Sequence, residues 1–457
     1  MNLFAIAGKS IRQRFLSSSL TAFSVSLGVM LMVAVLVIYG IMDRVFNQQA
    51  VGYQLIIGPK GSDMQLVLNT IYRVGAPLQN LPYLYYEELK KDPRIGVAIP
   101  VCLGDTTQQG GFPIVGTTEK YFENEYAPGR DFMLRGKTFT ESFDAIIGSQ
   151  VHLTNGWDIG TQFRLVHGGA ESHVHDEQFT VAGVLAPTGT PNDKTVIIHL
   201  NGFYAISGHD APMREAVKRW HEFSGQPSDD ASLDAATAEW RKKCGISEAD
   251  EEEEKRAHQA GGQHHHHHHG ACDVQKEVTA ILVNMKGDSM TAAAMFSGEM
   301  KRGHKVQAVN PIMPMQRLMS DILGNVRTVL LVMTGLIIIV SGVGIFVSIY
   351  NSMSDRRKEI AIMRALGAQR RTVFAIILAE SILLCFGGGI FGILLGHGLV
   401  FGAAPIVQQQ TGILISPFAF EPIELVLLPA LIALASLVGV VPGLAAYRTD
   451  VARALAD

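Results

Sequence analysis

The chain has 457 residues, of which 47% are hydrophobic, and a formal net charge of −4 at pH 7. This length allows two or three domains, but the positive mean hydropathy argues against an entirely soluble protein. The charge excludes a typical nucleic-acid-binding protein, because such proteins carry clustered Lys and Arg on their soluble part. Here the basic clusters flank apolar segments instead, and the acidic residues fall between those segments. We therefore expect a membrane protein with one large aqueous insertion.

Four stretches with almost no charge are each long enough to cross a bilayer, which needs about 20 apolar residues. The first is too long for a cleavable signal peptide, and no clear small-residue cleavage site follows it. Basic residues precede the first stretch, separate the second from the third and follow the fourth, so the positive-inside rule places both termini in the cytoplasm. The predicted segments are a cytoplasmic interfacial helix (1–15), a first span (16–42), an external domain (43–325), a second span (326–351), a cytoplasmic segment (352–371), a third span (372–406), a short external loop (407–424), a fourth span (425–447) and a cytoplasmic tail (448–457).

The external domain shows short apolar runs separated by Gly, Pro, Asp and Asn, which predict β-strands and turns. A helix is expected at Tyr83–Lys91, so the domain is predicted to be α+β. The expected strands are Gln54–Gly58, Phe112–Thr117, Asp144–Gly148, Phe179–Leu185 and Thr195–Leu200. From about residue 209 to 274 the sequence becomes polar and Ala-rich, which indicates an insertion that is partly helical and partly disordered. The fold class is thus a membrane protein with four transmembrane helices in a 1+3 arrangement around this domain.

The cytoplasmic segment between the second and third spans has the pattern of a short amphipathic helix. Ser352 and Asp355 could form a capping box, while Gly367 falls where a helix would end. Ile360, Met363 and Leu366 recur at helical spacing, so they could place an apolar stripe in a groove of a soluble partner. The alternative is a basic loop that only fixes the topology.

The same segment carries the strongest family resemblance in the chain. Residues 355–371 read DRRKEIAIMRALGAQRR, which is similar to the "RxxEIxxxRAxGA" stretch of MacB/FtsX/LolC-type ABC transporter permeases. Two core-domain stretches, 145–149 with 157–160 and 179–185, and the closing segment from Pro442 also resemble that family. The resemblance covers nearly the whole chain outside the insertion.

The resemblance implies a bacterial inner-membrane permease that works by mechanotransmission, with ATP-driven closure passed through the membrane to the periplasmic domain. Its implied partners are a cytoplasmic ABC ATPase and a second permease copy, identical or different, with a periplasmic adaptor or substrate-binding protein as a further possibility. The residues that would couple the chain to the ATPase are Asp355, Arg356, Arg357, Lys358, Glu359, Ile360, Met363, Arg364, Leu366 and Gly367.

No catalytic residues are predicted, and ATP and Mg²⁺ are expected to bind the partner ATPase. Gly8-Lys9-Ser10 superficially matches the end of a phosphate-binding loop, but that loop requires a glycine at position 3, where this chain has Leu3. The chain is therefore expected not to be an enzyme, and no cofactor is expected to bind it other than a metal ion such as Zn²⁺.

Two features of the third span point to helix packing. Glu380 is a carboxylate within an apolar segment, where we expect it to be paired or close to the membrane surface. Gly388, Gly392 and Gly396 repeat every four residues, a pattern that lets two helices approach closely and that could serve dimerisation.

The histidines raise the question of a metal. Imidazole is a good ligand for zinc, copper and nickel, and the candidate ligands are His167, His173, His175 and the tract His264, His265, His266, His267, His268 and His269. The tract is equally explained as an affinity tag or as a solvated linker. Cys244 and Cys272 flank this part of the insertion and could form a disulfide or remain two thiols.

Three functions remain open on the sequence alone. The leading one is an ATP-driven permease subunit that exports or extracts a lipoprotein, a peptide or a small molecule at the periplasmic face. The second is a metal-linked ABC system that uses the histidine-rich insertion. The third is a non-transporting regulator, similar to FtsX, that activates a periplasmic partner.

Overall fold

The computed structural model describes residues 3–47, 52–167, 174–206, 209, 211–246, 271–318, 320–321, 324–355, 357–411, 420, 422 and 424–447. The chain divides into a helical unit, drawn from residues 1–45, 318–410 and 414–457, and an α+β unit formed mainly by residues 46–317. Among the described residues, four helices are long and apolar enough to cross a membrane, and the α+β unit lies between the first and second of them in sequence. The predicted fold class is thereby confirmed.

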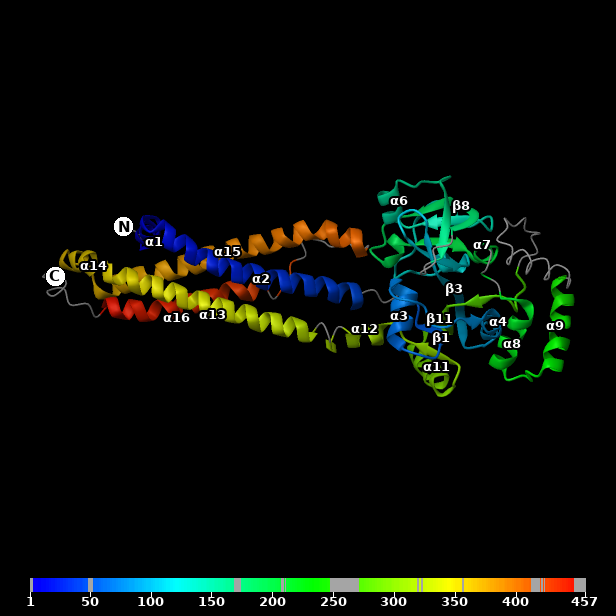
Figure 1. Ribbon diagram of the computed structural model, residues 1–457. Helices are drawn as coiled ribbons and strands as arrows, with labels where there is room; N and C mark the ends of the chain where they lie inside the picture. Colours follow the sequence, from blue (N-terminus) through cyan, green and yellow to red (C-terminus); the bar gives the residue numbers. More distant parts are fainter. Residues whose placement is uncertain are drawn as a thin grey trace. The chain divides into compact units, whose positions relative to one another are not determined.

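The described residues of the helical unit form four long helices and two short ones, which can be followed in Figure 1. The membrane-spanning parts are Ser18–Gly40, Gly324–Val347, Arg370–Ile406 and Glu424–Leu444. Val329, Leu336 and Leu437 are more than half exposed on their outer faces, which suits contact with lipid. The helices are α1 (Leu3–Gln13), α2 (Phe15–Asn47), α13 (Gly324–Asp355), α14 (Arg357–Ala365), α15 (Arg370–Thr411) and α16 (Glu424–Tyr447).

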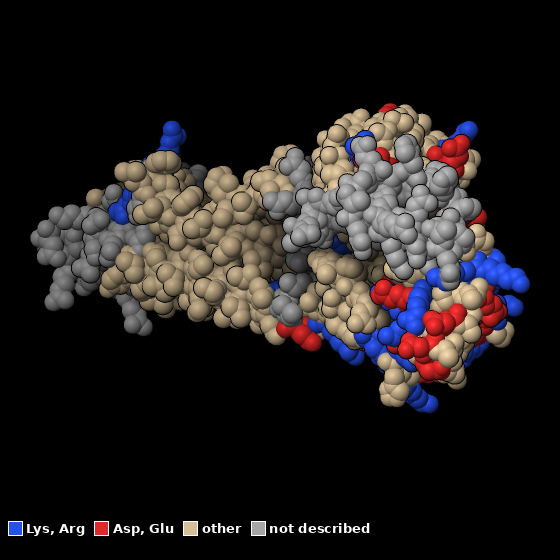
Figure 2. All heavy atoms as spheres, turned by 45° about the vertical axis from the view of Figure 1, so that its right-hand side comes forward, with Lys and Arg blue, Asp and Glu red and all other residues tan. Residues whose placement is uncertain are grey.

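Charge is distributed very differently over the two units. On the face shown in Figure 2, Lys, Arg, Asp and Glu crowd the surface of the α+β unit, whereas the described surface of the helical unit is almost free of them. Water solvates charged side chains on the first surface, while an uncharged surface on the second avoids the large cost of placing charges in hydrocarbon.

One prediction about helix ends is wrong. The sequence suggested that Ser352 and Asp355 form the N-terminal capping box of the cytoplasmic helix, but α13 stays helical through Asp355. Ser352 therefore lies inside a helix, where its backbone cannot adopt the extended conformation of an N-cap residue. The next helix, α14, begins only at Arg357.

The α+β unit is built on a mixed sheet whose strands follow the order β12-β1-β11-β3-β4-β9-β6-β8-β5, with β7 paired to β3 and β8. The pairs β4–β9 and β6–β8 are parallel, and the others are antiparallel. The strands are β1 (Leu55–Pro59), β3 (Ile95–Thr107), β4 (Pro113–Thr117), β5 (Leu134–Gly136), β6 (Asp144–Ile147), β7 (Gln162–His167), β8 (Val174–Leu185), β9 (Val196–His199), β11 (Ala280–Met285) and β12 (Val306–Val309), with a separate pair formed by β2 (Leu81–Pro82) and β10 (Glu277–Val278).

Strand β3 joins two hydrophobic cores because its two halves pair with different neighbours. Its first half pairs with β11, and its second half pairs with β4 and β7. The first core includes Ile57, Ile281 and Phe296, and the second includes Ile147 and Phe179, all fully or almost fully buried. The remaining helices around the sheet are α3 (Asp63–Tyr72), α4 (Tyr83–Leu89), α5 (Lys120–Glu123), α6 (Ser149–Asn155), α7 (Leu200–Tyr204), α11 (Met290–Arg302) and α12 (Ile312–Leu318).

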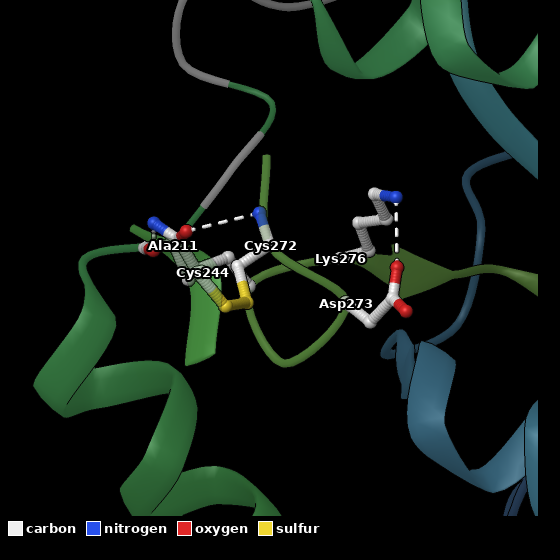
Figure 3. The surroundings of a disulfide bond; sticks show 6 residues. Ala211, Cys244, Cys272, Asp273 and Lys276 are labelled. Atoms are coloured by element: carbon white, nitrogen blue, oxygen red, sulfur yellow. Dashed lines mark hydrogen bonds and ion pairs between the residues drawn. A yellow bond between two sulfur atoms is a disulfide. The ribbon is translucent and has the colours of Figure 1, made fainter. Parts of the chain in front are cut away.

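The described part of the predicted insertion is a small helical subdomain. Helices α8 (Met213–Ser224) and α9 (Asp230–Cys244) pack together around a third core that includes Val217, Trp220 and Leu233. A disulfide joins Cys244, at the end of α9, to Cys272, with Cα atoms 5.9 Å apart (Figure 3). The disulfide therefore closes the base of the segment between these cysteines. Residues 247–270, including the acidic run and the histidine tract, lie outside the described residues.

Candidate functional site

Helix α14 is the central element of the predicted coupling segment. Arg357, Lys358 and Glu359 form its first turn, whereas Arg356 lies outside the described residues. The helix ends at a Schellman motif, in which the Ala368 amide donates to the Met363 carbonyl over 3.0 Å and the Gly367 amide donates to the Arg364 carbonyl over 3.1 Å. Gly367 has a φ of 101°, a left-handed conformation that glycine adopts at little cost.

The apolar residues of α14 divide between a buried face and an exposed face. Ile360 and Ala361 are buried, whereas Ile362 is 50% exposed and Leu366 is 84% exposed. Met363 and Arg364 are half-buried. The predicted stripe of Ile360, Met363 and Leu366 is thus not one uniform surface, because its first member packs against the helical unit and its last projects from it.

The structure gives Glu380 a polar partner within the helical unit. Ser10 on α1 donates a hydrogen bond to the Glu380 carboxylate on α15, with Oγ and Oε1 3.1 Å apart. Both side chains are buried, Ser10 to 3% exposure and Glu380 to 6%. A buried carboxylate is tolerated only where hydrogen bonds replace its lost water, so this contact ties the amphipathic helix α1 to the start of the third span.

The glycine stripe of α15 lies against α2 of the same chain. A Cβ atom added at Gly388 or Gly392 would lie 2.7 Å from a carbonyl oxygen of α2, that of Ala22 or Ser26, and one at Gly396 would lie 2.8 Å from the Val33 side chain. The absence of Cβ atoms therefore lets the two backbones approach closely. Since α2 already covers this stripe, a second copy of the chain would have to dock elsewhere on the helical unit.

The structure also contains a polar pair in the membrane unit that the sequence did not reveal. His397 on α15 lies 2.9 Å from the Glu424 carboxylate at the start of α16, measured from Nε2 to Oε2. The Glu424 side chain is fully buried. The two residues are 27 positions apart, so neither helical spacing nor composition could pair them.

The candidate metal ligands are only partly described. His167 ends β7 and His175 lies near the start of β8, with His175 buried at 3% exposure. The structure brings His175 together with Asp105 and His209, neither of which was predicted as a ligand. His173 and His264–His269 lie outside the described residues.

The fold and these sites define a permease-type membrane protein with an extended soluble domain, and comparison with known families supports this class. Residues 18–243 match the MacB-like periplasmic core domain, and residues 331–451 match the FtsX-like permease C-terminal domain. The chain belongs to the MacB/FtsX-type family of ABC transporter permeases.

Individual relatives match over shorter stretches. The chain is 34% identical over 131 residues to the macrolide export ATP-binding/permease protein MacB of Syntrophobacter fumaroxidans, covering 27% of this chain and 18% of that protein. It is 32% identical over 128 residues to the ABC transporter permease YtrF of Bacillus subtilis, covering 26% and 29%. The crystal structure of the periplasmic region of MacB from Actinobacillus actinomycetemcomitans is similar at 12% identity with a TM-score of 0.32, over 60% of this chain and 95% of that one. The matched stretches thus span less than a third of either curated relative.

Proposed function

We propose that this chain is the permease subunit of an ATP-driven mechanotransmission system, in which a separate cytoplasmic ATPase docks on α14 and the α+β unit acts on a substrate outside the cytoplasm. The observation that carries the proposal is that one face of α14 is buried while another face is exposed. Ile360 and Ala361 anchor the helix to the membrane unit, while Ile362 and Leu366 remain exposed. Exposed apolar residues on a short anchored helix are what helix-in-groove recognition by a soluble partner requires.

The chain connects this docking helix to the external domain through consecutive helices. One residue separates α14 from α13, and α13 follows α12 of the α+β unit after a short segment. The other connection to the external domain is α2, which precedes that domain in the chain. This helix has 33 residues and therefore extends about 50 Å, longer than the ~30 Å hydrocarbon core. Because helices resist bending, displacement of α14 by a closing ATPase would be carried along α13 towards the external domain.

The remaining parts of the proposal concern topology and assembly. Basic residues beside α1 and within residues 356–371 favour a cytoplasmic location for both termini and for α14. A second permease copy would complete the transporter, and a periplasmic adaptor or substrate-binding protein would deliver or accept the substrate. Lipoproteins, peptides and small molecules are the substrate classes that suit an external domain of this family.

The test measures ATP hydrolysis by the cognate ATPase, identified by its phosphate-binding loop among proteins that co-purify with the full chain. In proteoliposomes, the double variant Glu359→Ala/Arg364→Ala should lower permease-dependent ATPase stimulation by about tenfold or more, since each 1.4 kcal/mol of lost interface energy is tenfold in affinity. The matched control is Gln369→Ala, an exposed residue just beyond the helix. Unchanged stimulation in the double variant, with normal membrane insertion, would contradict docking at α14.

Two further measurements separate the alternatives. A regulator similar to FtsX would keep ATPase coupling and activate a periplasmic enzyme without moving any substrate across or out of the vesicle membrane. A metal-linked system would instead show ATPase stimulation that depends on Zn²⁺ added to the external side.

A further inference from the structure

Three potential metal ligands meet inside the α+β unit although they are far apart in sequence. Asp105 lies near the end of β3, His175 near the start of β8, and His209 between α7 and α8. Each offers one donor atom, and these atoms all lie within 4.8 Å of one another. Asp105 and His175 are 5% and 3% exposed, and the His209 side chain is 4% exposed. A cluster of this kind in the interior differs from the acidic groups that gather on protein surfaces, because burial removes the water that would otherwise solvate it.

The hydrogen bond that His209 makes through Nδ1 determines what its other ring nitrogen, Nε2, can do. His209 Nδ1 lies 2.8 Å from the Phe203 carbonyl oxygen. A carbonyl oxygen can only accept, so Nδ1 carries the hydrogen. The other nitrogen, Nε2, lies 3.1 Å from Asp105 Oδ2. Without a hydrogen between them, the Nε2 lone pair would face a carboxylate oxygen, so either a proton held by one of the two groups or a metal ion must lie at this contact.

Two observations, the second hydrogen bond of His209 and the position of His175, favour the metal over the proton. Metal-bound histidines almost always donate their second N–H to a carboxylate, a backbone carbonyl or water, and His209 donates to the Phe203 carbonyl. The 3.1 Å separation of Nε2 and Oδ2 fits an ordinary hydrogen bond, and it is also compatible with the ~3.3 Å expected between two ligands that each lie ~2.0–2.1 Å from a tetrahedral ion. His175 brings a second imidazole to the same point, with its ring 5.3 Å from that of His209 between centroids, so a third donor atom is in place for a metal ion.

We propose that Asp105, His175 and His209 form a buried site for a divalent transition-metal ion, for which Zn²⁺ is the best match. Two imidazoles and one carboxylate are a ligand set that zinc readily accepts, and they leave a fourth coordination position for water or another donor. None of the three ligands belongs to the histidine tract of residues 264–269, and the proposal does not depend on the ATPase-docking role of α14.

The position of His209 gives the site a structural consequence. His209 is followed closely by Ala211, whose carbonyl accepts a hydrogen bond from Gln275 Nε2 over 3.1 Å, and by Met213, the first residue of α8. The chain leaves the sheet and enters the α8–α9 subdomain at this point. A metal bound between β3, β8 and His209 would therefore fix the base of the subdomain to the sheet, and loss of the metal would release it.

The experiment uses the full chain in detergent with His264–His269 replaced by serine, so that the tract does not contribute ligands. After removal of metals with EDTA, this parent should bind one Zn²⁺ per chain in competition with a chromophoric chelator. Co²⁺ should bind in its place and give visible absorption bands of a low-symmetry four-coordinate ion. Asp105→Asn, His175→Gln and His209→Gln should each lower Zn²⁺ affinity by at least ~100-fold, the upper range for loss of an outer-sphere partner.

The matched control is His304→Ala, since His304 is exposed on the same unit and should leave the stoichiometry and affinity of the parent unchanged. If the ligand variants fail to fold, X-ray absorption of the zinc-loaded parent still decides, because the proposal requires two imidazole nitrogens and a carboxylate oxygen around the ion. A parent that binds no stoichiometric Zn²⁺ would overturn the proposal and leave a buried histidine–aspartate ion pair. Parent-like affinity in the three folded variants would overturn it as well.

Discussion

The close contact between α15 and α2 makes Gly392→Ala the sharpest test of how the membrane unit is packed. The new Cβ would lie 2.7 Å from the Ser26 carbonyl oxygen and 2.7 Å from Val29 Cβ. Carbon atoms in favourable contact lie about 3.5–4.0 Å apart, so the helices would have to separate by roughly 1 Å. Overpacking of this kind typically costs about 1–3 kcal/mol. The separation would also loosen the contacts at Gly388 and Gly396, which belong to the same stripe.

The matched control is Gly398→Ala on the same helix. Nothing lies within 4 Å of a Cβ added there, so the substitution creates no clash. Alanine is also the better helix former by up to about 1 kcal/mol. We therefore expect Gly398→Ala to leave the stability of the helical unit unchanged or slightly raised, while Gly392→Ala lowers it.

The two free thiols allow each unit to be followed separately. Cys385 is buried on α15 and Cys102 is buried on β3, while the other two cysteines are joined in the disulfide. During an SDS titration in mixed micelles, maleimide labelling read by peptide mass spectrometry would report the opening of each unit at its own cysteine. Gly392→Ala should shift labelling of Cys385 to lower SDS without moving that of Cys102. Equal Cys385 midpoints in Gly392→Ala and Gly398→Ala would refute the proposed close packing.

Two further predictions concern the α+β unit, where all three tryptophans lie and where fluorescence follows unfolding. Replacing Cys244 and Cys272 with serine should destabilise the α8–α9 subdomain by about 3.6 kcal/mol, the chain-entropy value for a separation of 28 residues, and should abolish the effect of reductant on thermal unfolding; a reductant effect that survives in the variant would contradict this. The Arg94 hydrogen bonds hold the pKa of Asp92 below its ordinary value, so their stabilisation is present above the unfolded pKa of about 3.9 and is lost as pH falls through the lower folded pKa. Asp92→Asn should therefore cost at most about 1 kcal/mol at pH 7, because the pair is partly exposed, and progressively less as pH falls through the folded pKa; a cost independent of pH would rule out the ion pair as its cause.

The elements that local patterns determine were predictable from the sequence. The apolar runs of β1, β4, β6, β8 and β9 were each expected within a few residues of where they lie, apart from the longer start of β8. Strand β3 was missed because Gly96, Pro100 and Gly104 interrupt it by local rules. It forms because β11, β4 and β7 pair with it on successive stretches. Strand propensity is decided by such neighbours, which no short window contains.

The candidate sites also differ in how much of each could be predicted from local sequence patterns. The glycine stripe of α15 was visible as a spacing, but only the fold shows that α2 occupies it. His175 was a candidate ligand among sixteen histidines. Asp105 and His209 were not candidates, because no metal-binding motif surrounds either residue in the sequence. The sheet joins Asp105 to the His175 region through β7, since β3 pairs with β7 and β7 pairs with β8. A ligand set assembled across strands cannot be read from spacing along one chain segment.

The contacts within the helical unit bear on how movement could pass through the membrane. The glycine stripe fastens α15 to α2, and the Ser10–Glu380 hydrogen bond fastens α1 to α15. Ser24 on α2 also lies 3.0 Å from Ser341 on α13, measured between Oγ atoms. The two helices that continue into the external domain, α2 and α13, are therefore linked to each other and to α15. Because close-packed helices shift as units rather than deform continuously, a force applied at α14 would reach both connections to the external domain rather than only the nearer one.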